Sequence, residues 1–329
     1  MPESKLYTFS SSPHAKAPRT TKRIMIDVCI ALLPAVIMGI VLFGGSAALL
    51  VGIALVSAVL SEVIYKLICK KSFKQIVNEF DFTSCVTGLL VGLSIGVNYP
   101  WYTPIFGSVF AIIVVKMLFG GTGKNLVNPA IVGRIFVFMS FQAMVSAWVL
   151  PSIPSISNST VTTGATVLEG LNKGSLPNLS NLDLLLGTGV MGCIGETCKV
   201  ALILGGIYLV IRKVISPIFP LVYITVTGLF TVSLNGFDFG FFLPSILSGG
   251  LILGAIFMAT DYTTTPNTLL GNIVYFVGLG LITAGLRIAT GMEVVSFAIL
   301  LGNLFVPLID KFIIPKPFGY KKQKKAKVK

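Results

Sequence analysis

Long apolar segments separated by short polar breaks dominate this sequence and leave few folds open to it. Residues 45–61 and residues 269–286 each contain no charged side chain. Only 11% of the chain is charged, whereas soluble domains carry about 25%. A lipid core offers the backbone no water, so only helices and closed barrels cross it, and apolar runs of this length are typical of helices. The sequence therefore predicts an all-α integral membrane protein.

About ten transmembrane helices are expected. Their expected bounds are 24–43, 47–68, 84–97, 105–119, a fifth span ending near 150, a sixth ending near 212, then 217–234, 243–259, 269–288 and 294–313. Residues 184–198 are interpreted either as a half-helix dipping into the membrane or as the start of the sixth span. Five spans in each half predict that the second half is inverted relative to the first. A weak internal repeat supports this, because Asn-Tyr and Thr-Pro at 98–104 recur as Asp-Tyr and Thr-Pro at 261–266.

These spans divide the chain into five regions. Residues 1–23 form a basic N-terminal segment, residues 24–150 the first five-helix half, and residues 151–183 a large polar loop. Residues 184–313 form the second five-helix half, and residues 314–329 a basic tail. No cleavable signal pattern precedes the first apolar run.

The basic residues predict the orientation of the chain. With the N-terminus in the cytoplasm, 22 of the 25 Lys and Arg residues fall on the cytoplasmic side, as the positive-inside rule requires. Lys173 and Arg287 fall outside, and Lys199 is ambiguous. Both termini are therefore expected in the cytoplasm, with the 151–183 loop on the outer face. The net charge of +13 lies in loops and in the tail, which favours contact with anionic lipid over nucleic acid.

Histidine and cysteine offer little chemistry. The single histidine, His14, lies in the N-terminal segment, so no hydroxyl nucleophile has an obvious base and no catalytic residue is predicted. The five cysteines form no CxxC pair, and no metal site is predicted. An iron–sulfur cluster shared among several subunits is the less favoured alternative to buried thiols.

Polar residues near the membrane are the other candidates. Gly123-Lys124 is followed by Asn125 and is flanked by membrane helices, so the 120–130 segment is not a nucleotide-hydrolysing phosphate loop. Glu196 and Lys199 are spaced to meet on one face of a helix, where they form either a functional membrane site or a pair at a loop edge. Asp261 is expected either to line a cytoplasmic-side pocket or to cap a helix.

One hydroxyl-rich stretch in the polar loop resembles a known cofactor tag. Thr163-Gly164-Ala165-Thr166, followed by Leu168, resembles the tag of flavin-carrying subunits in Rnf complexes and in sodium-translocating NADH:quinone oxidoreductases. The alternative is an ordinary threonine-rich loop. The Gly-Gly-Thr-Gly-Lys-Asn segment at 120–125 and the Met-Ala-Thr-Asp segment at 258–261 also resemble this family, in the family's order.

The resemblance implies a function. It implies FMN bound to Thr166 through a phosphoester, and a second, non-covalent riboflavin between the spans. The D subunit of Rnf is the nearer likeness, because the long N-terminal extension of the quinone-reducing subunit is missing. The implied protein sits in the cytoplasmic (inner) cell membrane and relays electrons between ferredoxin and NAD while Na⁺ or H⁺ is transported. Implied partners are the A, B, C, E and G subunits and a flavin transferase. The alternatives are a channel or transporter for small polar solutes, and the B subunit of the quinone-reducing complex.

Overall fold

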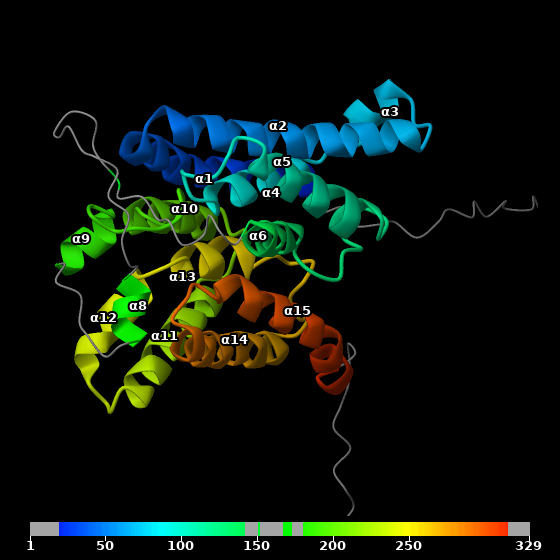
Figure 1. Ribbon diagram of the computed structural model, residues 1–329. Helices are drawn as coiled ribbons and strands as arrows, with labels where there is room; N and C mark the ends of the chain where they lie inside the picture. Colours follow the sequence, from blue (N-terminus) through cyan, green and yellow to red (C-terminus); the bar gives the residue numbers. More distant parts are fainter. Residues whose placement is uncertain (1–19, 142–150, 152–166, 173–179, 315–329) are drawn as a thin grey trace, which may run out of the picture.

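The computed structural model describes residues 20–141, 151, 167–172 and 180–314, and within them every regular element is a helix (Figure 1). The first part of the chain forms α1 (Thr21–Phe43), α2 (Gly45–Ile68), α3 (Phe73–Asn78), α4 (Thr83–Leu93), α5 (Thr103–Val109), η1 (Phe110–Met117) and α6 (Pro129–Ser140). The later part forms α8 (Val167–Asn172), α9 (Asn181–Leu186), α10 (Lys199–Ile211), α11 (Ile218–Leu234), η2 (Phe239–Phe241), α12 (Phe242–Leu247), α13 (Leu251–Leu253), η3 (Gly254–Met258), α14 (Leu269–Thr290) and α15 (Val295–Phe312).

Capping residues set several of these helix ends. The Asn128 side chain accepts from the Ala130 N–H at 2.9 Å and so caps α6, whose first residue is Pro129. Proline suits this position because its missing N–H would have no partner inside the helix. Gly291 ends α14 in a left-handed conformation, with φ at 68°. Such caps fix where each apolar segment enters and leaves the bundle.

Among the helices that the structure describes, four are long and apolar enough to cross a membrane: α1, α2, α14 and α15. A fifth span results if Phe239–Leu247 and Leu251–Met258 are one crossing, bent by 67°. Five further apolar segments are shorter: α4, Thr103–Met117, α6, α10 and α11. The prediction of an all-helical, multi-pass protein is confirmed in the described residues, whereas the count of ten spans and the cytoplasmic termini stay predictions.

Two of the expected spans differ from the structure, and a third is described only in part. The eighth, expected as one helix over 243–259, is broken at residues 248–250. The sixth begins only at Lys199, since residues 187–198 form turns after α9 instead of a half-helix. The fifth is helical to Ser140, and residues 142–150 lie outside the described part of the chain.

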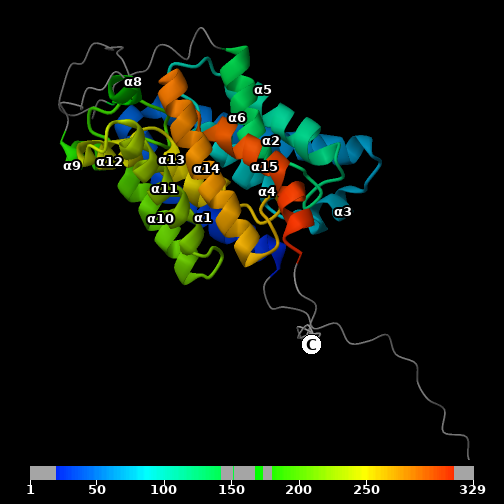
Figure 2. The ribbon, with the colours of Figure 1, turned by 90° about the horizontal axis from the view of Figure 1, so that it is seen from below.

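The bundle has two distinct ends. Figures 1 and 2 place α3 at one end, called the α3 end, and α8, α9 and α12 at the opposite end, called the α9 end. The expected halves touch across the middle, where α1 packs against α10 and α6 packs against α15. Gly205 of α10 permits the first contact, because a Cβ there would lie 2.1 Å from the Ala31 carbonyl oxygen of α1.

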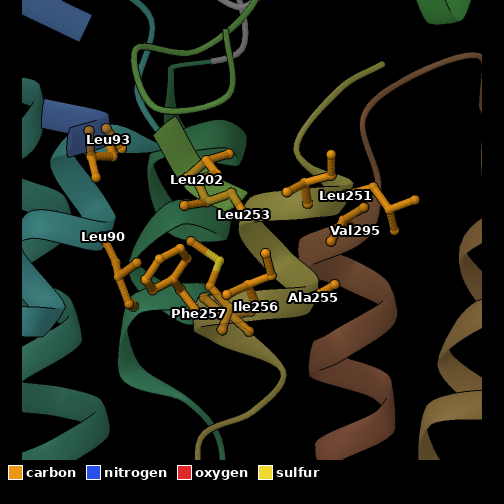
Figure 3. Close-up of a cluster of buried hydrophobic side chains, with 14 of the residues drawn as sticks. Leu90, Leu93, Leu202, Leu251, Leu253, Ala255, Ile256, Phe257 and Val295 are labelled. Atoms are coloured by element: carbon orange, nitrogen blue, oxygen red, sulfur yellow. The ribbon is translucent and has the colours of Figure 1, made fainter. Parts of the chain in front are cut away.

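A second contact between the halves joins the end of α4 and the loop after it to the loop before α10. Gly195 N–H donates to the Leu93 carbonyl at 2.7 Å, and Ile194 N–H donates to the Ile95 carbonyl at 3.1 Å. The main apolar cluster surrounds this contact and draws on both halves, with Leu90 and Leu93 facing Leu202 and Phe257 (Figure 3). The α4 loop, α10 and the broken helix are therefore held together by one shared core.

Candidate functional site

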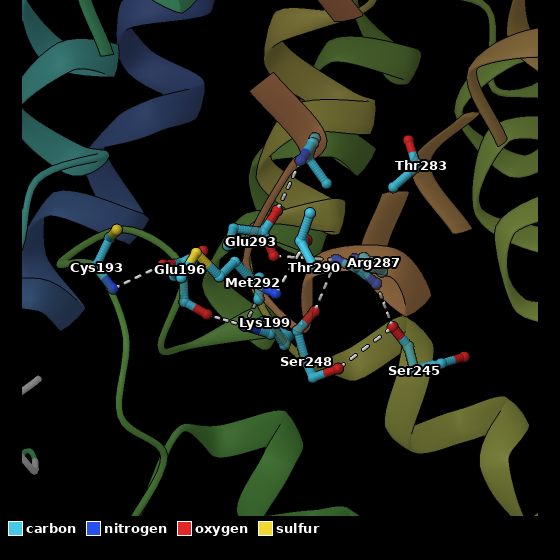
Figure 4. A network of polar contacts seen from close by, with 12 residues as sticks. Cys193, Glu196, Lys199, Ser245, Ser248, Thr283, Arg287, Thr290, Met292 and Glu293 are labelled. Atoms are coloured by element: carbon cyan, nitrogen blue, oxygen red, sulfur yellow. Dashed lines mark hydrogen bonds and ion pairs between the residues drawn. The ribbon is translucent and has the colours of Figure 1, made fainter. Parts of the chain in front are cut away.

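The break in the eighth apolar segment gathers buried charges at the α9 end of the bundle. Residues 248–250 interrupt the helix between α12 and α13, which leaves carbonyl groups without helical donors. Arg287 of α14 donates to the Ser245 carbonyl at 2.8 Å and to the Ser248 carbonyl at 3.2 Å (Figure 4). It also forms an ion pair with Glu293 at 3.1 Å. A buried guanidinium thus serves as the cap of α12.

Lys199 completes this cap from the first residue of α10. Its Nζ donates to the Gly249 carbonyl at 3.1 Å and, through a very short contact, to the Glu196 carbonyl. The expected pairing of Glu196 and Lys199 on one helix face is therefore wrong. Glu196 precedes the helix, and its backbone, not its carboxylate, receives the lysine.

The Glu196 carboxylate faces the opposite way, toward α6. Its Oε1 accepts from the Cys193 N–H at 2.7 Å, and its Oε2 lies 4.0 Å from Arg134 Nη2. Glu196 Oε2 and Arg134 Nη1 have no hydrogen-bond partner in the described structure, and neither has Arg287 Nε. We call Arg134, Glu196, Lys199, Arg287 and Glu293 the helix-break cluster.

Gly249 is the residue that lets this cluster close. Its φ is 63°, a conformation that glycine adopts readily. A Cβ there would lie 1.7 Å from Glu293 Oε2 and 2.8 Å from Leu168 Cδ1. Leu168 belongs to α8 and is buried, and α8 packs on α12 and α14. The short helix that follows the proposed flavin tag is therefore seated on the helix break.

The tag itself lies outside the described residues. Residues 152–166, which include Thr163, Gly164, Ala165 and Thr166, are not part of the described structure, so only Leu168 of the predicted tag is placed. Among the predicted polar residues, Glu196 and Lys199 lie together in the helix-break cluster. Asp261 lies elsewhere, at a pocket near the α3 end.

This second site, the Asp261 pocket, is bordered by the first turns of α1, α4 and α6, by the ends of η1 and α10, and by residues 256–263. The space in it that a water-sized molecule can reach is about 90 Å³, so the pocket must widen to hold a ligand that needs the roughly 300–1,000 Å³ of small-molecule sites. Its polar lining includes Thr83, Lys116, Thr122, Asn125, Asn128 and Asp261. The pocket combines apolar walls with hydrogen-bonding groups, as ligand sites do.

Two similar turns flank the pocket. In one, Asp81 accepts from the N–H of Thr83 at 3.1 Å and from its hydroxyl at 2.5 Å. In the other, Asp261 accepts from the N–H of Thr263 at 3.2 Å and from its hydroxyl at 2.9 Å. Asp261 therefore caps its own turn, while α14 begins at a different cap, Thr268.

The two carboxylates are perturbed in opposite directions. Burial raises the pKa of Asp261, and the hydrogen bonds from Thr263 offset only part of that effect. Burial also acts on Asp81, but the charge of Lys116 and the hydrogen bonds from Thr122 and Thr83 outweigh it and lower its pKa. Burial thus shifts Asp261 toward its protonated form, whereas the neighbouring charge and hydrogen bonds shift Asp81 toward its ionised form.

Lys116 connects the pocket to a second buried charge cluster. Its Nζ contacts Glu62 Oε2 at 2.8 Å, Asp81 Oδ1 at 4.0 Å and the Thr83 hydroxyl. Lys66 contacts the other Glu62 oxygen at 2.5 Å. Two lysines therefore meet two carboxylates, and both Glu62 oxygens are paired.

Sequence reasoning missed several of these residues. Arg134, Arg287 and Glu293 were not candidates, and the only local signal was the Gly249-Gly250 pair inside an apolar run. Asp81 and Thr83 were missed too, although Asp-Phe-Thr at 81–83 resembles Asp-Tyr-Thr at 261–263.

The distribution of side chains defines the class of protein. Large apolar residues such as Ile37, Val56 and Leu270 are exposed on the long helices, whereas Glu62, Lys199 and other charged groups are buried. That arrangement suits a lipid-facing surface around a polar interior. The chain is a multi-pass helical membrane protein with internal charged sites.

Comparison with known proteins identifies its family. The model of the NQR2, RnfD, RnfE family matches residues 8–319. The D subunit of a Na⁺-translocating ferredoxin:NAD⁺ oxidoreductase complex from Acetobacterium woodii is 40% identical over 320 residues, 97% of each chain. The D subunit of a proton-translocating ferredoxin:NAD⁺ oxidoreductase complex from Clostridium ljungdahlii is 35% identical over 95% of this chain and 96% of its own. The D subunit of an ion-translocating oxidoreductase complex from Stutzerimonas stutzeri is 30% identical, covering 90% and 92%. The chain belongs to the NQR2, RnfD, RnfE family, which confirms the resemblance.

Proposed function

We propose that this chain is the D subunit of an ion-translocating ferredoxin:NAD⁺ oxidoreductase complex. The observation that carries the proposal is likeness over nearly the whole chain, 97% of both sequences for the Acetobacterium woodii relative. In that role the chain is a membrane component of an oxidoreductase and is inactive alone. It assembles with the A, B, C, E and G subunits in the cytoplasmic membrane, where electron transfer is coupled to transport of Na⁺ or H⁺.

Thr166 is proposed to carry FMN through a phosphoester, after modification by a flavin transferase. A tag of this kind needs a hydroxyl and small neighbours, which Thr166, Gly164 and Ala165 supply. Burial of Leu168 against Gly249 supports the proposal, because it anchors α8, which begins at the residue after Thr166. The covalent flavin supplies a one-electron relay at the α9 end, and the protein sets its position.

The Asp261 pocket, widened by movement of its lining side chains, is the proposed site of the non-covalent riboflavin. A flavin ring needs flat apolar walls and a polar edge, and Leu90 and Phe257 supply walls while Lys116, Asn125 and Asn128 supply donors. Lys116 is already oriented by Glu62, so its ammonium stands preorganised at the pocket wall. The flavin when bound supplies a second redox centre, near the α3 end.

The opposed ends of the bundle support the proposed topology. The lysine-rich segment after α2 lies at the α3 end, and α8 and α9, which follow the polar loop, lie at the other (Figures 1 and 2). The ten-span, inverted-repeat arrangement is supported by the pairing of α1 with α10 and of α6 with α15. We propose that the α3 end faces the cytoplasm.

Reconstitution tests this function. The complex, purified through a tag on this chain and placed in liposomes, is expected to reduce NAD⁺ with reduced ferredoxin and to transport Na⁺ or H⁺ in the same experiment. Acid precipitation should release one riboflavin and leave one flavin bound to this chain. A colourless chain that instead conducts small polar solutes would replace the proposal with the channel alternative. A flavin-bearing complex that reduces quinone from NADH would identify the quinone-reducing relative.

A further inference from the structure

The helix-break cluster carries one more positive than negative group. Among the side chains that the structure describes there, Arg134, Lys199 and Arg287 face only Glu196 and Glu293; the first four of the cluster are buried and Glu293 is half-buried. An uncompensated buried charge is costly, so such groups tend to shed or bind a proton. Arginine keeps its proton in proteins, which leaves Lys199 as the cation able to lose one.

The cluster at the other end shows what a balanced arrangement looks like. There Lys66 and Lys116 face Glu62 and Asp81, and none of these four appears among the described buried side-chain atoms that lack a partner. In the helix-break cluster, by contrast, Arg134 Nη1, Glu196 Oε2 and Arg287 Nε have no partner. The excess positive charge and the missing hydrogen-bond partners therefore occur in the same cluster.

The contacts of Lys199 fit an uncharged amine. Its described hydrogen bonds go to two backbone carbonyls, those of Glu196 and Gly249, and not to a carboxylate. A neutral amine has two N–H donors, which these two carbonyls satisfy, whereas an ammonium has a third. An unpaired third donor in a side chain that is 1% exposed costs free energy.

The charged and titratable groups around Lys199 come from three segments. Glu196 and Cys193 lie in the turn before α10, Arg287 lies on α14, and Glu293 lies between α14 and α15 (Figure 4). The remaining neighbour, the break between α12 and α13, presents backbone carbonyls. The amine therefore sits where α10, the broken helix and α14 meet.

We propose that Lys199 is a proton-binding site, at which one proton is exchanged between the amine and water at the α9 end of the bundle. Binding adds the proton to the nitrogen lone pair, and release returns it to water, so no electron or other group moves. Negative charge that reaches this region favours uptake, and its departure favours release. The inference rests on the described cluster and not on a flavin, so it stands or falls separately from the proposed function.

Two substitutions imitate the protonated and the neutral states of Lys199. Lys199→Arg keeps a permanent positive charge at this position. Lys199→Met places an uncharged side chain of similar length there. We would measure thermal unfolding of the intact purified complex over a pH series from about 6 to 10, a window that lies below the ordinary lysine range. The wild type is expected to follow the arginine variant at the acid end and the methionine variant at the alkaline end. The difference between the two variants should not change with pH.

Controls make the result decisive. Lys66→Met removes a buried lysine from the balanced cluster and should lower the unfolding midpoint while keeping the shape of the wild-type pH profile. A wild type that parallels the arginine variant throughout would overturn the proposal, as would a methionine variant with the wild-type profile. Lys199→Gln is a second uncharged variant. If neither uncharged variant assembles while the arginine variant does, Lys199 is a permanent cation and the proposal is wrong.

Discussion

Lys199 Nζ donates to the Gly249 carbonyl at 3.1 Å and thereby ties the first residue of α10 to the break between α12 and α13. The two residues are 50 positions apart in the chain. Their contact joins the start of one apolar segment to the interior of another. It also brings the N–H donors of the Lys199 amine to carbonyls that no helix satisfies, as irregular backbone at membrane depth requires.

The first prediction tests how tightly this break is packed. Gly249→Ala should prevent stable assembly, because its Cβ would overlap Glu293 Oε2 and φ is positive. Gly236→Ala is the matched control, since Gly236 has φ of 73° but open space around its Cβ position. It should cost about 1–2 kcal/mol, the usual cost of a left-handed backbone for an L-residue. Yield and unfolding midpoint of the purified complex distinguish the two, and equal effects would mean that Glu293 moves aside.

The second prediction compares a buried ion pair with an exposed one. Glu62→Gln should destabilise the protein by about 3–5 kcal/mol, because Lys116 and Lys66 then lose the carboxylate they share. Glu79→Gln breaks a pair of similar geometry with Lys71, 2.5 Å apart but on the surface, and should change little. Thermal unfolding in detergent measures both. Similar losses in the two variants would contradict the assignment of Glu62 to the interior.

The third prediction concerns pH and uses the opposite shifts of two aspartates. The raised pKa of Asp261 means that its contribution to stability is present at acid pH and is lost as pH rises through the folded-state pKa. Asp261→Asn should therefore remove the loss of stability that accompanies ionisation of Asp261 as pH rises. Asp81 has a lowered pKa, so its contribution is present above the ordinary aspartate range and is lost on acidification. Asp81→Asn should lose stability at neutral pH. The measurement is the unfolding midpoint of each variant relative to the wild type across a pH series. If both variants move in the same direction, the assignment of opposite pKa shifts to Asp261 and Asp81 is wrong.

The apolar pattern predicted the helices well, because lipid and backbone hydrogen bonding leave a segment such as 45–68 little choice. The break at 248–250 was hidden by the same pattern, since apolar residues continue on both sides of Gly249. Glu196 and Lys199 were predicted as partners from their spacing, yet spacing has that meaning only inside a helix, and Glu196 precedes one. Its carboxylate faces Arg134 instead, 62 positions earlier, a contact that only tertiary packing creates.

The fourth prediction is topological. Both termini and Lys70 should face the cytoplasm, and Ser175, which lies outside the described residues, should face outward. Single cysteines introduced at these positions into a cysteine-free background can be tested with a membrane-impermeant reagent on intact cells. A cysteine at 175 should react without permeabilisation, and one at 70 only after it. The reverse pattern would invert the proposed orientation.

The fifth prediction addresses the proposed flavin directly. Thr166→Val removes the hydroxyl that a phosphoester needs and keeps nearly the same shape, so it should abolish the covalent FMN while the complex still assembles. Thr163→Val keeps that hydroxyl and should reduce modification without abolishing it. Electron transfer through the complex should stop in the Thr166 variant alone.

Peptide mass spectrometry of the 151–183 region, from protein co-expressed with a flavin transferase, tests the proposed flavin site most directly. We expect one FMN on Thr166 in the wild type and in a fraction of the Thr163→Val protein, and none in Thr166→Val. Flavin attached to Thr163, or an unmodified wild-type peptide, would contradict the proposal.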